Sequence, residues 1–268
     1  PYLTDAHYNL ANTFANIGQL KKADQSYDKA LKINPKNPKI WSNKLLNLNY
    51  NENFSSEYIF NQHRLFDKQF SFLNKNKNNI KNKNDRLRVG YVSSDFRKHS
   101  VAYFIKALLK NHNRRLIETF CYYNNYIIDE TTELLKTYCE NWRSIFEMDD
   151  KDVFRKIKDD SIDILVDLSG HTPGNKLLVF ALKAAPIQIT YLGYPNTTGL
   201  STMDYRLTDK YADPGDYSDP LFSEKLIKLD KSFLCYSGND DISFNKTIPQ
   251  YKNSFITFGS FNNFKKIY

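Results

Sequence analysis

Cysteine is scarce in this 268-residue chain, which has three, at Cys121, Cys139 and Cys235. No two of them form a CxxC pair, and none has the spacing of a metal-ligand set. An odd number also does not suit a framework of paired disulfides. The pattern favours reduced, buried thiols in a cytoplasmic protein over a disulfide or metal role.

Long hydrophobic runs are also missing. No stretch approaches the roughly 18 apolar residues that a membrane-spanning helix needs, and the first residues lack the charged-then-apolar pattern of a signal peptide. These absences predict a cytoplasmic protein without a membrane partner. The chain begins at Pro1 and stops at Tyr268 inside a pattern typical of a strand-to-loop turn, so we expect a fragment at both ends.

The formal net charge of +8 suggests a nucleic-acid partner, but its distribution does not. Residues 1–86 hold 14 Lys and Arg against 7 Asp and Glu, whereas residues 87–268 hold 24 against 23. The excess therefore lies in the N-terminal part, where no recognition motif with interleaved aromatic residues accompanies the lysines. We interpret it as a solvated lysine- and asparagine-rich face and expect no nucleic-acid partner.

Residues 4–34 have the spacing of a helical hairpin, which Gly18 divides and Pro35 closes. Its apolar and small residues are Leu10, Ala11, Phe14, Ala23, Tyr27 and Ala30. This spacing over residues 1–35 is similar to the roughly 34-residue tetratricopeptide repeat, with an unrelated helical hairpin as the alternative. Because one repeat cannot bury its own face, at least three stacked units are expected.

Two further helices follow, with a degraded repeat pattern. Helical spacing continues over 41–48 and 58–70, with a serine N-cap before the second helix. We predict that residues 36–73 form an atypical capping repeat, in which His63 is a hydrogen-bonded packing residue. The run NKNKNNIKNKND at 74–85 is polar and of low complexity, so it is predicted to be a linker.

From Arg86 the pattern changes to alternating strands and helices. The predicted strands are 87–92, 118–123, 162–168, 187–192 and 205–208, and the predicted helices are 101–110, 130–139, 150–158 and 176–182. This alternation predicts an α/β fold, in which the helical repeat precedes a Rossmann-like parallel domain over residues 86–252. The apolar run IDILVDL fits a central strand that is covered on both faces.

Three polar loops follow predicted strand ends, and the carboxyl ends of parallel strands line one cleft. The first loop holds Asp95, Arg97 and His99, the second is SGHTPGN at 169–175, and the third is GYPNTTG at 193–199. Uncharged polar groups with histidines and aromatic rings suit a hydroxylated ligand or a hydroxyl nucleophile. The candidate contact residues are His99, His171, Tyr194, Pro195 and Thr197.

Other chemistries have less support in the sequence. His99 and His171 could be two ligands of a metal, but no third ligand recurs at a suitable spacing. Asp160, Asp163 and Asp167 cannot all share one face of a strand, so we interpret Asp160 as a turn or cap residue. No GxGxxG motif follows a strand, so a dinucleotide-binding site lacks its motif.

Three sequence blocks carry a resemblance to a known family. They are LRVGYVSSDFRKHSVAYF, DILVDLSGHTPGNKLLVFALKAAPIQITYLGYPNTTGLSTMDYRLTD and TFGSFNNFKKI, with support from the helical segments IWSNKLLNLNY and EYIFNQHRLFD. Over nearly its whole length the chain resembles the O-GlcNAc transferases of glycosyltransferase family 41, in their bacterial-type form. The resemblance implies a GT-B fold of two Rossmann-like domains, with residues 253–268 at the start of the second, donor-binding one.

The resemblance also implies an activity and its partners. These are inverting, metal-independent transfer of N-acetylglucosamine from UDP-GlcNAc to Ser and Thr hydroxyls, without a cofactor, on proteins that the repeats would hold. His99 matches the family's active-site histidine, described as a proton acceptor, and Asp160 matches an acid considered as a catalytic group. His171 stands where animal members have a tyrosine. Asn263 replaces a nucleotide-contacting glutamine, and Lys266 matches a lysine that meets the donor's phosphates, where a cation would stabilise the leaving UDP.

Two alternatives stay open at this point. The same fold could use another donor or acceptor, such as GDP-fucose or asparagine, because the residues that specify the donor would lie beyond Tyr268. The second alternative is a repeat-based protein-binding module whose catalytic domain has decayed, against which the presence of His99 and Lys266 argues. We expect the 268 residues alone to be inactive as a transferase.

Overall fold

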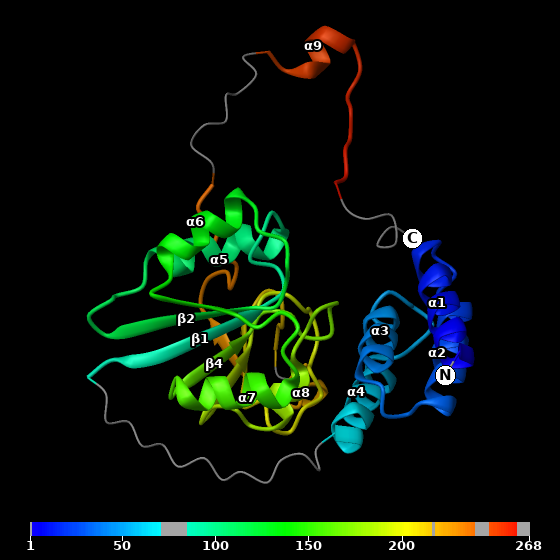
Figure 1. The fold of residues 1–268 in the computed structure, drawn as a ribbon. Coiled ribbons are helices and arrows are strands. Elements are labelled where there is room, and N and C mark those ends of the chain that lie inside the picture. The colour runs from blue at the N-terminus through cyan, green and yellow to red at the C-terminus, as the bar shows by residue number, and fades with distance from the viewer. Residues whose placement is uncertain (1, 71–84, 216–217, 239–246, 262–268) are drawn as a thin grey trace.

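The computed structural model describes residues 2–70, 85–215, 218–238 and 247–261 (Figure 1). Four helices come first, and a sheet with crossover helices follows. The helices are α1 (Tyr2–Asn16), α2 (Leu20–Ile33), α3 (Pro38–Leu48), α4 (Ser56–Phe70), α5 (Ser100–Lys110), α6 (Glu130–Tyr138), α7 (Asp150–Asp159), α8 (Leu177–Ala181), the 3-10 helix η2 (Asp219–Leu221) and α9 (Pro249–Asn253). Within the described ranges, no helix is long and apolar enough to cross a membrane.

The described residues form one sheet of seven strands, all of which run parallel. The strands are β1 (Leu87–Ser93), β2 (Ile117–Tyr123), β3 (Asn141–Ser144), β4 (Ile164–Asp167), β5 (Ile187–Thr190), β6 (Tyr205–Asp209) and β7 (Lys225–Leu229). Their order is β3-β2-β1-β4-β5-β6-β7. The chain therefore winds outward from β1, returns to β4 beside it and continues in the other direction. The strand order reverses between β1 and β4, which is where open α/β sheets place their ligands.

The predicted fold class, a helical repeat followed by a parallel α/β domain, is confirmed. All five predicted strands are present, but β3 and β7 were missed. β3 has only four residues, NWRS, and it forms one edge of the sheet. β7, KLIKL, forms the other edge and carries two lysines, of which Lys225 is exposed and Lys228 is half-buried. Short or charged edge strands bury little surface, so they leave a weak apolar pattern in the sequence.

The sheet is covered on both faces, by α5 and α6 on one and by α7 and α8 on the other (Figure 1). Ile105 and Leu135 fill the first apolar layer. Val153 and Phe180 fill the second, which also contains Phe66 of α4. The helical segment therefore shares a hydrophobic core with the sheet, so the two parts are packed directly against each other.

Small residues bring α1 and α2 close together, as predicted. Ala11, Ala23 and Ala30 are fully buried, and the Tyr27 hydroxyl donates a hydrogen bond to Asn12 Oδ1 across the hairpin (2.8 Å). Cys121 and Cys139 are buried free thiols, also as predicted. The prediction was wrong for Cys235, which is exposed because it follows the last strand of the sheet.

One glycine marks how closely the helices approach the sheet. Gly199 has a φ of +79°, and a Cβ there would lie 2.2 Å from the carbonyl oxygen of His63 in α4. Gly18, in the turn between α1 and α2, has a nearly equal φ of +76° but no atom within 4 Å of such a Cβ. An alanine would meet similar backbone strain at both positions, but only at position 199 would its Cβ also clash with another atom.

We therefore predict different effects for Gly18→Ala and Gly199→Ala. Gly18→Ala should lower the free energy of unfolding by about 1 kcal/mol, because alanine is strained at positive φ. Gly199→Ala should cost about 1–3 kcal/mol more, because it also forces α4 away from the loop after β5. Urea unfolding followed by circular dichroism measures both. Equal losses in the two variants would contradict the close docking of α4.

Candidate functional site

A cleft of about 490 Å³ lies at the carboxyl edge of the sheet. Its walls come from the loops that follow β1, β2, β3, β4 and β5. We call it the carboxyl-edge cleft, and its wall residues include His99, Asn124, Tyr126, Phe146, Pro173 and Gly193. The first two predicted loops therefore meet as expected, while the third contributes Gly193 at its beginning. The cleft lies beside the reversal of strand order, as the topology requires.

His99 stands where the first loop enters α5. It is the N-cap of this helix, and its Nδ1 accepts a hydrogen bond from the Val101 N–H (3.3 Å). The Asp95 carboxylate lies 3.8 Å from the same nitrogen. Since Nδ1 accepts, the neutral ring carries its proton on Nε2. The side chain is 37% exposed, so it can meet a ligand in the cleft.

Two glycines and one aspartate shape the second loop. The buried Asp167 carboxylate, at the end of β4, accepts hydrogen bonds from the Ser169 and Gly170 N–H groups and from the Thr190 hydroxyl. Burial raises the pKa of Asp167 to about 6, which these three donors oppose. Gly174 has a φ of +79° and packs directly against Ser94 of the first loop. Asp167 thus folds the loop so that its tip reaches the wall of the carboxyl-edge cleft.

The structure places His171 away from the cleft, in full burial beneath α3 and α4. Its Nε2 donates to the Thr198 carbonyl (2.8 Å), and its Nδ1 accepts from the Ser42 hydroxyl (3.1 Å). Burial and the nearby His63 hold the pKa of His171 well below its ordinary value. In this structure the ring is neutral and joins the helical segment to two sheet loops.

Tyr194 and His63 extend the same buried cluster. The Tyr194 hydroxyl donates to His63 Nε2 (2.8 Å) and accepts from the Asn49 amide (2.7 Å). His63 Nδ1 donates to the Ile59 carbonyl (2.7 Å), and burial lowers the pKa of His63 to about 4. His63 is thus the hydrogen-bonded packing residue that the sequence predicted. We call His63, His171, Tyr194, Ser42 and Asn49 the joint cluster.

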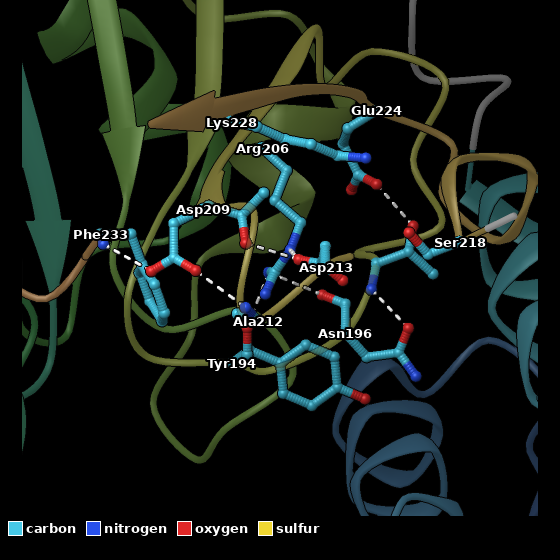
Figure 2. A network of polar contacts seen from close by, with 12 residues as sticks. Tyr194, Asn196, Arg206, Asp209, Ala212, Asp213, Ser218, Glu224, Lys228 and Phe233 are labelled. Carbon is cyan, nitrogen blue, oxygen red and sulfur yellow. Dashed lines mark hydrogen bonds and ion pairs between the residues drawn. The ribbon is translucent and has the colours of Figure 1, made fainter. Parts of the chain in front are cut away.

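The third loop is tied to the sheet by buried charged groups (Figure 2). The Arg206 guanidinium donates to the carbonyl oxygens of Tyr194 (2.9 Å) and Asn196 (3.2 Å). The Glu224 carboxylate accepts from the Thr197 hydroxyl (2.6 Å) and from the Thr198 N–H (2.7 Å). Thr197 is therefore fully buried and bonded within the protein, while Pro195 is exposed beside it.

Asp160 lies near the amino ends of β1 and β4, whereas His99 lies at the carboxyl ends of the strands. It is the C-cap of α7 just before β4, and its carbonyl accepts from Arg88 at the start of β1. Its carboxylate accepts two hydrogen bonds from Arg143 and one from the Tyr122 hydroxyl. It behaves as the cap residue that its position in the sequence indicates, and it is not part of the wall of the carboxyl-edge cleft. Asn263 and Lys266 lie outside the described residues.

Several wall residues of the cleft were missed from the sequence. Asn124, Asn125 and Tyr126 follow β2, and Phe146 follows β3. The rule that pointed to the other loops, polar residues just after a strand, also applies to the segment YYNNY. Phe146 could not be found in this way, because the strand before it was not recognised.

A family model for "Glycosyl transferase family 41" matches residues 58–253, and one for "Tetratricopeptide repeat" matches residues 4–37. The chain belongs to glycosyl transferase family 41. It is 41% identical to a rice protein named "Probable UDP-N-acetylglucosamine--peptide N-acetylglucosaminyltransferase SPINDLY", over 91% of this chain and 27% of the rice protein. A protein of Arabidopsis thaliana with the same name is 37% identical over 88% of this chain and 26% of its own length.

A solved structure gives the same result for the fold of this family 41 chain. It is the Thermobaculum terrenum O-GlcNAc transferase mutant K341M, which matches with a TM-score of 0.85 and 30% identity over 89% of this chain. The match covers 46% of the bacterial chain. The predicted family, glycosyltransferase family 41 with a tetratricopeptide repeat, is confirmed. This chain spans about a quarter of the plant relatives and about half of the bacterial one.

The joint cluster predicts how stability depends on pH. Folded His63 has a pKa of about 4, whereas a free imidazole titrates near 6.5, so between these values the unfolded chain binds a proton that the folded chain does not. The contribution of His63 to the free energy of unfolding should therefore fall as the pH drops from 6.5 to 4, by about 3 kcal/mol.

Urea unfolding at several pH values tests this prediction. In His63→Gln the dependence between pH 6.5 and 4 should become weaker, although the variant is less stable at pH 7. His7→Gln, which changes a histidine outside the joint cluster, is the control and should keep the full dependence. An unchanged slope in His63→Gln would show that His63 does not contribute to this pH dependence.

Proposed function

We propose that this chain is the repeat end and the acceptor-binding half of an inverting glycosyltransferase. The enzyme would transfer N-acetylglucosamine from UDP-GlcNAc to Ser and Thr hydroxyls of proteins. The observation that carries the proposal is the carboxyl-edge cleft, which holds His99 at the point where a sheet of this topology binds ligands. The family match and the names of the relatives support the reaction and the donor.

The acceptor would reach the cleft along a second cavity. This cavity of about 700 Å³ adjoins the carboxyl-edge cleft through Asn124, Phe146 and Pro173, and it extends to Tyr8 of the repeat helix α1 and Asn43 of α3. A single hydroxyl does not need such length, whereas an extended polypeptide does. The acceptor oxygen would attack the anomeric carbon from the face opposite UDP, and the bond from that carbon to UDP would break. The hydroxyl proton would pass to a phosphate oxygen of the departing UDP.

His99 would orient the acceptor hydroxyl through its Nε2–H group. The hydrogen bond from Val101 N–H to Nδ1 supports this role, because it leaves the proton of the neutral ring on Nε2. To act as a base through Nε2, His99 would need its proton on Nδ1 instead. That Nδ1–H group would then face the Asp95 carboxylate, which is 3.8 Å away. The Asp160 carboxylate is engaged by Arg143, so we assign it no step in the transfer, and its catalytic role stays a prediction.

Substitution of His99 in the full-length protein tests this role. His99→Ala should lower kcat/KM for protein acceptors on the order of a hundredfold, because the hydroxyl loses its orientation. His99→Gln keeps an N–H donor, so it should recover at least about tenfold of that loss. Tyr103→Ala, at an exposed position of the same helix, is the control. If His99→Gln is as impaired as His99→Ala, the histidine acts as a base, and full activity in His99→Ala would refute both roles.

Two parts of the proposal, the identity of the donor and the inactivity of the 268 residues alone, are tested in one set of assays. The full-length protein should hydrolyse UDP-GlcNAc and transfer its sugar to Ser or Thr, with GDP-fucose and asparagine acceptors as comparisons. The 268 residues alone should show no measurable turnover, because they span only about a quarter of the plant relatives and about half of the bacterial one. Preference for GDP-fucose would replace the donor in this proposal. Robust turnover by the 268 residues alone would contradict the division into halves.

A further inference from the structure

An exposed aromatic pair stands in the wall of the carboxyl-edge cleft. The rings of Tyr126 and Phe146 lie 5.5 Å apart at an angle of 53°. Tyr126 is 72% exposed and Phe146 is 39% exposed, although both are large and partly or wholly apolar. They come from different loops, after β2 and β3, so no local helix or strand accounts for their contact.

The loop that carries Tyr126 is held on both sides. Asn124 Nδ2 donates to the Gly174 carbonyl (2.9 Å), and Asn125 Nδ2 donates to the Ser94 carbonyl (3.0 Å). On the other side, the Tyr123 hydroxyl at the end of β2 donates to the Ile127 carbonyl (2.5 Å). A backbone fixed on both sides keeps the Tyr126 ring in the open, so little entropy is lost when a ligand meets it.

A strained turn presents Phe146. Met148 N–H donates to the Ile145 carbonyl (3.2 Å), which closes a four-residue turn with Phe146 and Glu147 in the middle. Glu147 has a φ of +66°, a conformation that favours glycine and that a glutamate adopts only at a cost. Ser161 and Lys183, which lie outside the cleft, also have positive φ, so the strain at Glu147 does not by itself mark a ligand site. What the turn does is hold the Phe146 ring at the cleft wall.

We propose that Tyr126 and Phe146 bind an apolar side chain of the acceptor protein next to the hydroxyl that is glycosylated. This inference rests on the proposed function and adds a specificity determinant to it. Phe146 also lines the second cavity, which leads toward the repeat helices, so the pair lies on the path of an extended acceptor. Two tilted rings offer a wide apolar surface with no fixed charge, which suits an apolar side chain.

Paired acceptor peptides test the proposal with the full-length protein. Each peptide has one central threonine in a Gly/Gln background, and one flanking position carries either leucine or asparagine, which have similar size. At one or two flanking positions the leucine peptide should be used about tenfold better than its asparagine partner, as burial against an aromatic pair predicts. Tyr126→Ala should bring this ratio close to one by raising KM for the leucine peptide. Phe146→Leu, a milder change, should lower the ratio in the same direction.

The controls separate this proposal from the proposed function. Tyr211→Ala removes a tyrosine that is equally exposed at 73% but outside the cleft, and it should keep the wild-type ratio. Hydrolysis of UDP-GlcNAc by water should be unchanged in Tyr211→Ala. An unchanged leucine preference, a raised KM for the donor or a lower melting temperature of Tyr126→Ala would each overturn the aromatic-pair proposal. The last result would mean that another part of the chain covers the ring. Absence of transfer by the wild type to any acceptor would instead overturn the proposed function.

Discussion

The docking of the helical segment on the sheet depends on two buried imidazoles that stay neutral. His63 and His171 each use one ring nitrogen to donate to a backbone carbonyl and the other to accept from a hydroxyl. This arrangement satisfies every polar atom of both rings without burying a charge, which would be costly. The third and second loops are thereby fixed against α4 and α3, and the cleft inherits its shape from that contact.

The joint cluster also explains why polar residues of the second and third loops point away from the cleft. Tyr194 and Thr197 look like ligand contacts in sequence, because they follow a strand of a parallel sheet. Their hydroxyls instead bond to His63 and Glu224, and both side chains are buried. The loops need internal partners of this kind because α4 packs on the same edge, where a loop without them would leave buried polar groups unpaired.

The exposed residues of the carboxyl-edge cleft fall into two groups with different chemistry. His99, at the start of α5, offers a hydrogen-bond donor beside the reversal of strand order. Tyr126 and Phe146 offer an apolar surface, and the adjoining cavity leads to the repeat helices. In our proposals the first group handles the hydroxyl and the second selects its neighbours. The repeat would then hold the rest of the acceptor in line with the cleft.

The sequence by itself determined the class of fold, the helical repeat, the position of His99 and the family, because these depend on local periodicity and on motifs within continuous segments. It did not reveal β3 or β7, whose short or charged edge positions bury too little surface to leave a pattern. The tertiary structure decided which polar residues meet a ligand. His171 and Thr197 are hydrogen-bonded within the protein, Asp160 lies away from the cleft, and Tyr126 contacts Phe146. The sequence could not show this, because each of these contacts joins segments that are far apart in the chain.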